Sequence, residues 1–369
     1  MARRVYLHVG LPKTGTTYLQ TILWHNKDEL REQGLLLPGF GPRQHLWASA
    51  VVREEPDLTR RHADAPRAWD VLVRQTNAWD GTAVISHEFF AAASTEQARR
   101  AVADLTGAEV HVVLTARDTV SLVTARWQEH VKNGATTPID GYPVSEETSP
   151  QDAWDWGTLD VADVLRRWGS AVPAEHVHIL TLPKPTDPRE TLWLRFAELL
   201  GIDAGRCDAS ASQANESLGV VEVELLRRVN AELEGFRRPV DRGVWIRGYL
   251  AQGQLVPRKG EKFWPSPERV QELRARGDRA VDELAAAGYD VIGDLDDLRT
   301  PAELPSRRHP DSVTDAELAE AGAATIASML TDVRRLTRRR DDAPEPAPDS
   351  LVRKAARRAR RLWRRSQTR

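Results

Sequence analysis

Residues 4–24 constrain the fold of this chain more than any other stretch, because a strand pattern, a loop of small residues and a helix pattern follow one another without a gap. Apolar side chains alternate from Val5 to Val9, as they do in a buried strand. After residues 10–15, apolar side chains recur at helical spacing. The stretch is typical of a P-loop-like unit and predicts an α/β fold with a parallel β-sheet flanked by helices.

The loop at residues 10–15 is suited to an oxyanion. Its backbone N–H groups can turn inward, glycine permits close approach, and the N-terminus of the following helix adds partial positive charge. The spacing of Gly10 and Gly15 matches the loop that binds ATP or GTP, but Thr16 stands where that loop has a lysine. The lysine is Lys13, inside the loop, where it can meet the bridging oxygen of a shorter donor.

The order of residues in this loop resembles the 5′-phosphosulfate loop of sulfotransferases that use 3′-phosphoadenosine 5′-phosphosulfate (PAPS). The matching residues are Pro12, Lys13, Thr14, Gly15, Thr16, Thr17 and Tyr18. The resemblance implies that residues 12–17 bind the donor and that the hydroxyls of Thr16 and Thr17 help hold its 5′-phosphate. It implies that Lys13 stabilises charge on the leaving oxygen and the sulfonyl group, and that residues 1–300 have the sulfotransferase fold.

A second strand pattern, residues 110–116, ends at Arg117 and is followed by a helix pattern. The planar guanidinium of an arginine in this place suits a phosphate. Sulfotransferases have an arginine leaving this strand and a serine about two helical turns later, so the resemblance implies that Arg117 binds the 3′-phosphate. The position of the serine is Ala125, which leaves Ser121 or Thr124 as the helping hydroxyl.

His87 and Glu88 close a further buried strand pattern, residues 83–88. Ligands of open α/β sheets bind at the carboxyl ends of the strands, so either side chain could take a proton from an acceptor there. Successive residues point to opposite sides, and the pair could instead cap the next helix. Several carbohydrate-modifying sulfotransferases use a glutamate near this edge, which favours Glu88 as the base.

Two later segments bear on ligand binding. The tripeptide Arg258, Lys259 and Gly260 is similar to one with which many sulfotransferases bind the 3′-phosphate. Adjacent arginine and lysine residues are, however, commonly solvated surface residues. Residues 134–158 form a long polar loop of the kind that covers an active site. Together with residues 40–80 and 235–264, this loop is expected to form the walls of the acceptor site.

Composition excludes several classes of protein. The 52 basic and 54 acidic residues nearly cancel, which points to neither nucleic acid nor an acidic partner. The single Cys207 excludes an intrachain disulfide and suits a reducing compartment. We expect a cytoplasmic protein, since no apolar stretch would span a bilayer and the first strand leaves no room for a secretory signal. No His/Cys cluster has metal-binding spacing, so no metal is predicted.

The chain changes character beyond residue 300. Residues 301–340 predict a helical extension, and residues 341–369 begin with an acidic, proline-rich linker and end in a basic tail. Residues 351–369 could be a solvated, disordered tail. They could also form a basic amphipathic helix that contacts anionic lipid at the inner face of the membrane.

These features predict a sulfotransferase that moves a sulfuryl group from PAPS to a hydroxyl or amine, releasing 3′-phosphoadenosine 5′-phosphate (PAP). The acceptor could be a glycan, a lipid or a secondary metabolite. A kinase-like enzyme, with Asp118 holding magnesium, is one alternative. A non-catalytic nucleotide-binding protein, docked to a membrane by its tail, is another.

Overall fold

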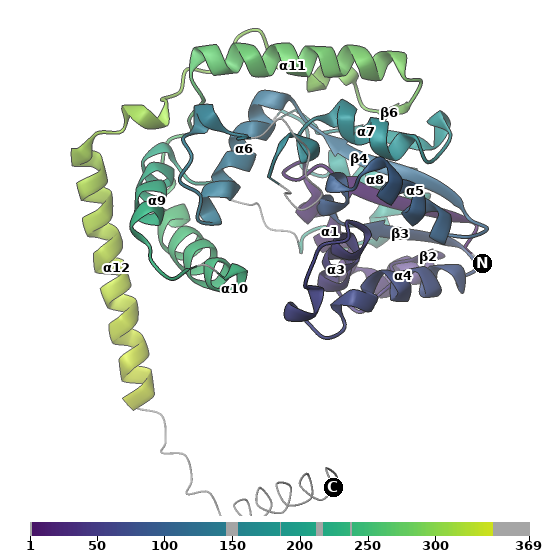
Figure 1. The fold of residues 1–369 in the computed structure, drawn as a ribbon, viewed down its shortest axis with the longest axis horizontal. Helices are drawn as coiled ribbons and strands as arrows, with labels where there is room; N and C mark the ends of the chain where they lie inside the picture. Colours follow the sequence, from purple (N-terminus) through teal and green to yellow (C-terminus); the bar gives the residue numbers. More distant parts are fainter. Residues whose placement is uncertain (1, 145–153, 185, 212–216, 237, 342–369) are drawn as a thin grey trace, which may run out of the picture. The chain divides into compact units, whose positions relative to one another are not determined.

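Six parallel strands form a sheet in the order β2-β3-β1-β4-β5-β6 (Figure 1). The strands are β1 (Arg4–Gly10), β2 (Leu35–Leu36), β3 (Thr82–Ser86), β4 (Glu109–Ala116), β5 (Val177–Thr181) and β6 (Asp290–Ile292). The computed structural model describes residues 2–144, 154–184, 186–211, 217–236 and 238–341. Within these residues, the predicted α/β fold with a parallel sheet flanked by helices is confirmed.

Strand β1 lies where the direction of the chain through the sheet reverses. From β1 the chain moves to one side for β2 and β3, then crosses to the other side for β4, β5 and β6. Strand β1 pairs with β3 through His8 and Ser86, and with β4 through His8 and Val113. Ligands of open α/β sheets bind outside the carboxyl ends of strands at such a reversal. This topology therefore places the predicted loop at the expected binding crevice.

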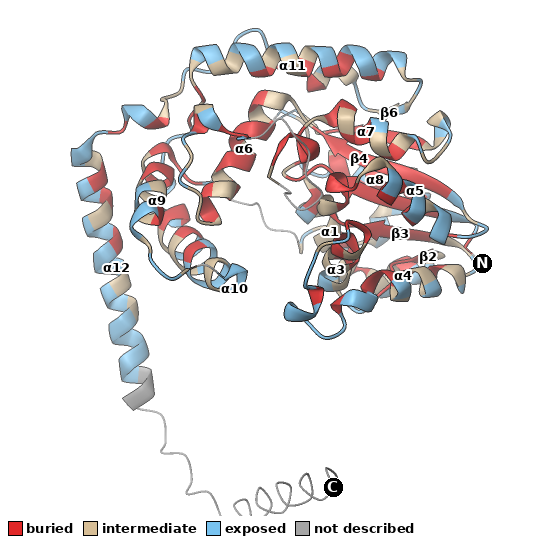
Figure 2. Ribbon diagram, viewed as in Figure 1, coloured by how far each residue is buried: buried red, intermediate tan, exposed pale blue. Residues whose placement is uncertain are grey.

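Helices cover both faces of the sheet, because alternate strand residues point to opposite sides. The buried cluster on one face contains Tyr6 of β1 together with apolar residues of helices α1 and α8. The buried cluster on the other face contains Val5 and Leu7 of β1 together with residues of helices α3 to α7, α9 and α11 (Figure 2). The helices are α1 (Thr16–His25), α2 (Lys27–Glu32), α3 (Pro42–Val52), α4 (Ala68–Asn77), α5 (Thr95–Asp104), α6 (Thr119–Lys132), α7 (Val161–Gly169), α8 (Thr191–Leu200), α9 (Val220–Glu232), α10 (Pro239–Asp241) and α11 (Pro267–Ala286).

A helix that the sequence does not predict occupies Arg242–Leu255. It is a π-helix, with a hydrogen-bond repeat one residue longer than that of an α-helix. Gly243, Gly248 and Gly253 recur at five-residue intervals along it. Glycine disfavours an ordinary helix and hides the apolar period, so the sequence predicts a loop for this segment. The long loop before α7 contains two short 3₁₀ turns, Ile139–Gly141 and Trp156–Thr158, and its residues 145–153 lie outside the described part.

Packing divides the chain into residues 1–318 and residues 319–369. Helix α12 (Asp315–Asp341) accounts for the predicted helical extension, and several of its apolar side chains are exposed, among them Ile326, Leu330 and Val333. The basic tail, residues 351–369, lies outside the described residues. Among those described, no helix is both long enough and apolar enough to cross a membrane.

Candidate active site

The loop after β1 has the geometry of an anion cradle. Lys13 and Gly15 both adopt left-handed backbone angles, with φ of 68° and 85°. A Cβ at Gly15 would lie 2.5 Å from Leu192 of α8, so only glycine fits. Helix α1 then begins at Thr16 with no side-chain cap among the described residues and no acidic residue in its first turn. Its first N–H groups therefore face the loop without a competing carboxylate.

The threonines of the loop differ in what they can offer a ligand. Thr14 is fully buried, and its hydroxyl bonds the carbonyl of Leu11 and, at 2.6 Å, the hydroxyl of Thr115 on β4. It therefore holds the loop to the sheet and leaves its backbone N–H for a ligand. Thr16 is also buried, whereas Thr17 is exposed at the start of α1.

A buried polar network continues from the loop toward β3. His8 Nδ1 lies 2.8 Å from the hydroxyl of Ser86, and His8 Nε2 lies 3.4 Å from that of Thr115. Gln20 of α1 donates to Ser86 at 3.3 Å and to Glu88 Oε2 at 3.2 Å. Burial lowers the pKa of His8 to about 4, so its ring is neutral at pH 7. The network connects the loop to Glu88 and fixes where that carboxylate lies.

Glu88 and His87 have different roles after β3. His87 is the N-cap of a short 3₁₀ helix, and its Nδ1 accepts the N–H of Phe89 at 3.2 Å. The neutral ring must then carry its proton on Nε2, which leaves no free basic nitrogen, and burial lowers the pKa of His87. Glu88 lies beside the loop, since a Cβ on Gly10 would be 3.3 Å from the Glu88 carbonyl oxygen.

The Glu88 carboxylate is ionised at neutral pH. Burial alone would raise the pKa of Glu88, but interactions with His87, Gln20 and Arg126 outweigh it, and the pKa lies below its ordinary value. A charged carboxylate near an anion cradle can accept a proton without first having to lose one.

Arg117 lies directly against the loop. Its Nη1 is 3.5 Å from the carbonyl oxygen of Lys13, and its buried Nε has no hydrogen-bond partner among the described residues. Burial lowers the pKa of Arg117, and Asp118 partly offsets this effect. A buried guanidinium nitrogen without a partner is costly, and an anion would satisfy it.

The two hydroxyls considered for the 3′-phosphate site are not equivalent. Ser121 stands in the first turn of α6, where its N–H donates to Asp118 Oδ1 at 2.9 Å, and it is partly exposed. Thr124 is buried one turn later and donates its hydroxyl to the carbonyl of Val120 at 2.7 Å. Ser121 is therefore better placed for a ligand beside Arg117.

The acidic partner of Lys13 is not predicted by the sequence. Lys13 Nζ lies 2.6 Å from Glu129 Oε2 on α6, and Arg247 of the π-helix lies 2.8 Å from the other carboxylate oxygen. Burial raises the pKa of Glu129, but Lys13 and Arg247 outweigh it and bring the pKa to about 2. The sequence shows Glu129 and Lys132 only as a possible pair on one helix, and nothing in it connects Arg247 with the loop.

The tripeptide at residues 258–260 packs against the start of α9. Arg258 Nε lies 3.1 Å from Glu222 Oε1, and a Cβ on Gly260 would overlap the other oxygen of the same carboxylate. Arg258 would have to leave Glu222 in order to bind a phosphate. Its role in donor binding stays a prediction, as does that of Lys259.

Two tryptophans of the long loop lie in different surroundings. Trp156 is buried, and the guanidinium of Arg276 lies 3.7 Å from the centre of its ring, so it anchors the loop. Trp154 is only partly buried, and it lies against Arg126 and His130 of α6. Of the two, Trp154 has the surface that an acceptor could contact.

Comparisons with known proteins add a likeness of fold. No family model matches the chain, and no curated protein matches its sequence. A crystal structure of a sulfotransferase from Alicyclobacillus acidocaldarius is similar, with a TM-score of 0.42 and 14% identity over 79% of this chain and 97% of that one. The sulfotransferase domain from the curacin biosynthetic pathway has a TM-score of 0.37 and 13% identity over 79% and 98% of the two chains. Since both TM-scores lie below 0.5, neither likeness carries weight for the function of this chain.

Proposed function

We propose that this protein transfers a sulfuryl group from PAPS to a hydroxyl or amine of a small molecule, glycan or lipid. The observation that carries the proposal is the convergence of Lys13, Glu88 and Arg117, which follow the carboxyl ends of the adjacent strands β1, β3 and β4. The side chain of Arg117 approaches the backbone of Lys13 to 3.5 Å. The proposal is supported because groups able to bind an anion and to accept a proton follow adjacent strands at the same edge of the sheet.

The donor's two phosphates match two features of the site, the loop after β1 and the guanidinium of Arg117, which lies 3.5 Å from the loop backbone. PAPS carries phosphates at both the 3′ and 5′ positions of a single ribose. In the proposed complex the N–H groups of residues 14–17 and the hydroxyls of Thr16 and Thr17 hold the 5′-phosphate. The unpartnered Nε of Arg117 and the hydroxyl of Ser121 hold the 3′-phosphate. A linear triphosphate would leave Arg117 without this match.

The proposed reaction is an in-line displacement at sulfur. The acceptor oxygen or nitrogen bonds to sulfur while the bond from sulfur to the 5′-phosphate oxygen breaks, and PAP leaves. Glu88 takes the acceptor's proton, and Lys13 stabilises charge on the departing oxygen. Because Lys13 is paired with Glu129 in the ligand-free protein, it must turn from that carboxylate toward the donor. No step in this sequence is assigned to a metal.

The kinase-like alternative needs a lysine after the second glycine of the loop and a carboxylate that can hold magnesium. Thr16 occupies the lysine position of the ATP-binding loop. Asp118, the candidate magnesium ligand, caps α6 by accepting the N–H of Ser121 at 2.9 Å. A non-catalytic nucleotide-binding protein would bind PAP but would not turn over PAPS.

Calorimetry with PAP, ADP and ATP tests the proposed function. PAP should bind at least about tenfold more tightly than ADP, because the additional charged hydrogen bonds to its 3′-phosphate are each worth about 1.5–3 kcal/mol. Labelled PAPS should then be consumed with a suitable acceptor in the presence of a chelator. Equal binding of PAP and ADP would contradict the donor assignment, and magnesium-dependent ATP turnover would favour the kinase-like alternative.

Glu88→Gln is expected to lower kcat by about 10²–10⁴-fold, the usual contribution of a positioned base, with PAP affinity retained. His87→Asn is the matched control, because asparagine can still accept the N–H of Phe89 as an N-cap. Since the pKa of Glu88 is below its ordinary 4.5, kcat/KM should stay level through neutral pH and fall only in more acidic solution. A fall in kcat/KM at a higher pH than a carboxylate of lowered pKa can produce, which disappears in His87→Asn, would identify His87 as the base instead.

A further inference from the structure

A cluster of histidines and carboxylates lies at the opposite edge of the sheet from the candidate active site. Glu109 and His111 are at the start of β4, His176 ends the 3₁₀ turn before β5, and His178 is the second residue of β5. Asp290 begins β6. Because β4, β5 and β6 are adjacent and parallel, their amino ends meet at one edge. The sheet thus brings together residues far apart in the sequence.

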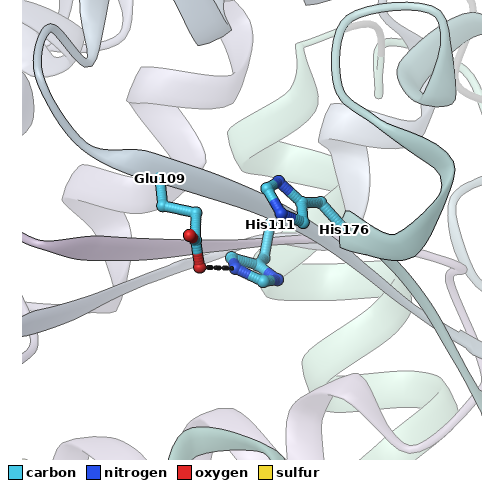
Figure 3. Close-up of side chains that lie close together, drawn as sticks. All are labelled: Glu109, His111 and His176. Carbon is cyan, nitrogen blue, oxygen red and sulfur yellow. Dashed lines mark hydrogen bonds and ion pairs between the residues drawn. The ribbon is translucent and has the colours of Figure 1, made fainter.

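Three of these residues lie close together, with the Glu109 carboxylate against His111 and the rings of His111 and His176 side by side (Figure 3). Donor atoms of Glu109, His111 and His176 all lie within 4.8 Å of one another. The rings of His111 and His176 stack with their centres 4.4 Å apart. His111 is buried, His176 is partly buried and Glu109 is exposed, so an ion could enter from solvent.

A chain of short contacts runs through the cluster. Glu109 Oε1 lies 2.7 Å from His111 Nε2, and His111 Nδ1 lies 2.7 Å from His178 Nε2. His178 Nδ1 lies 2.6 Å from Asp290 Oδ2. Each of these three contacts needs one hydrogen, but two neutral imidazoles supply only two. With two neutral imidazoles, one of the three contacts therefore lacks its hydrogen and is a place for a cation.

The place for that cation is at His111 Nε2. If Asp290 accepts from His178 Nδ1, then His178 Nε2 is free to accept from His111 Nδ1. His111 Nε2 is then a bare lone pair facing Glu109. An extra proton would fill this position, but it would not involve the nearby nitrogen of His176. A metal ion would use all three groups.

We propose that Glu109, His111 and His176 bind a divalent transition-metal ion, for which Zn²⁺ is the probe. Two imidazoles and one carboxylate form an accepted zinc ligand set, with the remaining position open to water. His178 and Asp290 supply the outer hydrogen bonds that orient a metal-bound histidine. Such an ion would tie β4 to the turn before β5.

Arg4 is the group that opposes metal binding at this cluster. Its Nε and Nη2 each lie 2.9 Å from Glu109 Oε1, the same oxygen that His111 contacts. An ion on His111 Nε2 needs more space than the 2.7 Å contact with Glu109 Oε1 leaves, so Glu109 must turn its second oxygen toward the ion when the ion binds. The site is separate from the proposed sulfuryl-transfer machinery, so its loss should leave PAP affinity unchanged.

Calorimetry of the full chain, with any affinity tag removed and the protein freed of metal, tests the site with Zn²⁺ alone. We expect one equivalent bound, a rise in Tm on adding Zn²⁺, and loss of both in His176→Ala. Asp290→Asn, which touches only His178, should weaken binding by about 10–100-fold, as changes to outer partners do.

His25→Ala is the matched control, because His25 also pairs with a carboxylate, Asp208 at 3.2 Å, and is exposed. It should bind Zn²⁺ like the unaltered chain. Circular dichroism would establish that His176→Ala is folded, which its partial exposure favours. Failure of the unaltered chain to bind Zn²⁺ at one equivalent, or undiminished binding by His176→Ala, would overturn the assignment.

Discussion

Lys13→Ala is expected to lower turnover of PAPS by about 10²–10³-fold, the usual effect of removing one group that stabilises transition-state charge. Lys13 is the ammonium group within the cradle, and its Nζ is only partly exposed beside Glu129. The loop's backbone N–H groups remain in the variant, so PAP binding should weaken much less than turnover. Single-turnover kinetics with labelled PAPS would measure the chemical step, and calorimetry the binding.

Lys184→Ala is the control for this change. Lys184 follows β5 at the same edge of the sheet, but it is exposed and pairs with Asp297. Its loss should affect neither measurement. If Lys13→Ala kept more than about a tenth of the turnover while remaining folded, Lys13 would not be acting on the leaving oxygen.

Arg117→Ala is expected to abolish the preference for a 3′-phosphate. PAP affinity should fall by about 10–100-fold, because the guanidinium makes charge-assisted hydrogen bonds that alanine cannot replace. Adenosine 5′-monophosphate, which lacks the 3′-phosphate, should bind the variant and the unaltered chain alike. Calorimetry with both nucleotides gives the ratio directly.

Arg117→Lys sharpens the same experiment. A lysine keeps the charge but not the planar pair of donors, so it should recover part of the preference and not all of it. An equal loss of affinity for PAP and adenosine 5′-monophosphate would mean that Arg117 only supports the loop, through its contact with the Lys13 carbonyl.

Much of the fold could be predicted from short-range pattern. Apolar strand patterns marked β1, β3 and β4, and helical spacing marked α1, with errors of a few residues at their ends. The loop after β1 and Arg117 after β4 were recognisable because each is a local motif at the end of a strand. Their meeting at one crevice follows from parallel pairing alone.

Features that depend on distant residues could not be predicted. Lys13 and Glu129 are 116 residues apart, and Arg247 sits on a π-helix whose glycines hide its period. The cluster around His111 joins three strands through residues that show no metal-binding spacing. The N-cap role of His87, by contrast, is local and is one of the two alternatives that the sequence left open for His87 and Glu88.

The pairing of Lys13 with Glu129 has a consequence for selectivity. The ammonium group of Lys13 has a tethered counter-ion, the Glu129 carboxylate, at 2.6 Å. Free sulfate or inorganic phosphate must compete with that built-in carboxylate through one point of attachment. A nucleotide that also binds Arg117 through its 3′-phosphate has a second point of attachment, which helps it displace the Glu129 carboxylate from Lys13. On the proposed function, Glu129 thus acts as an internal competitor that keeps common cellular anions from occupying the enzyme.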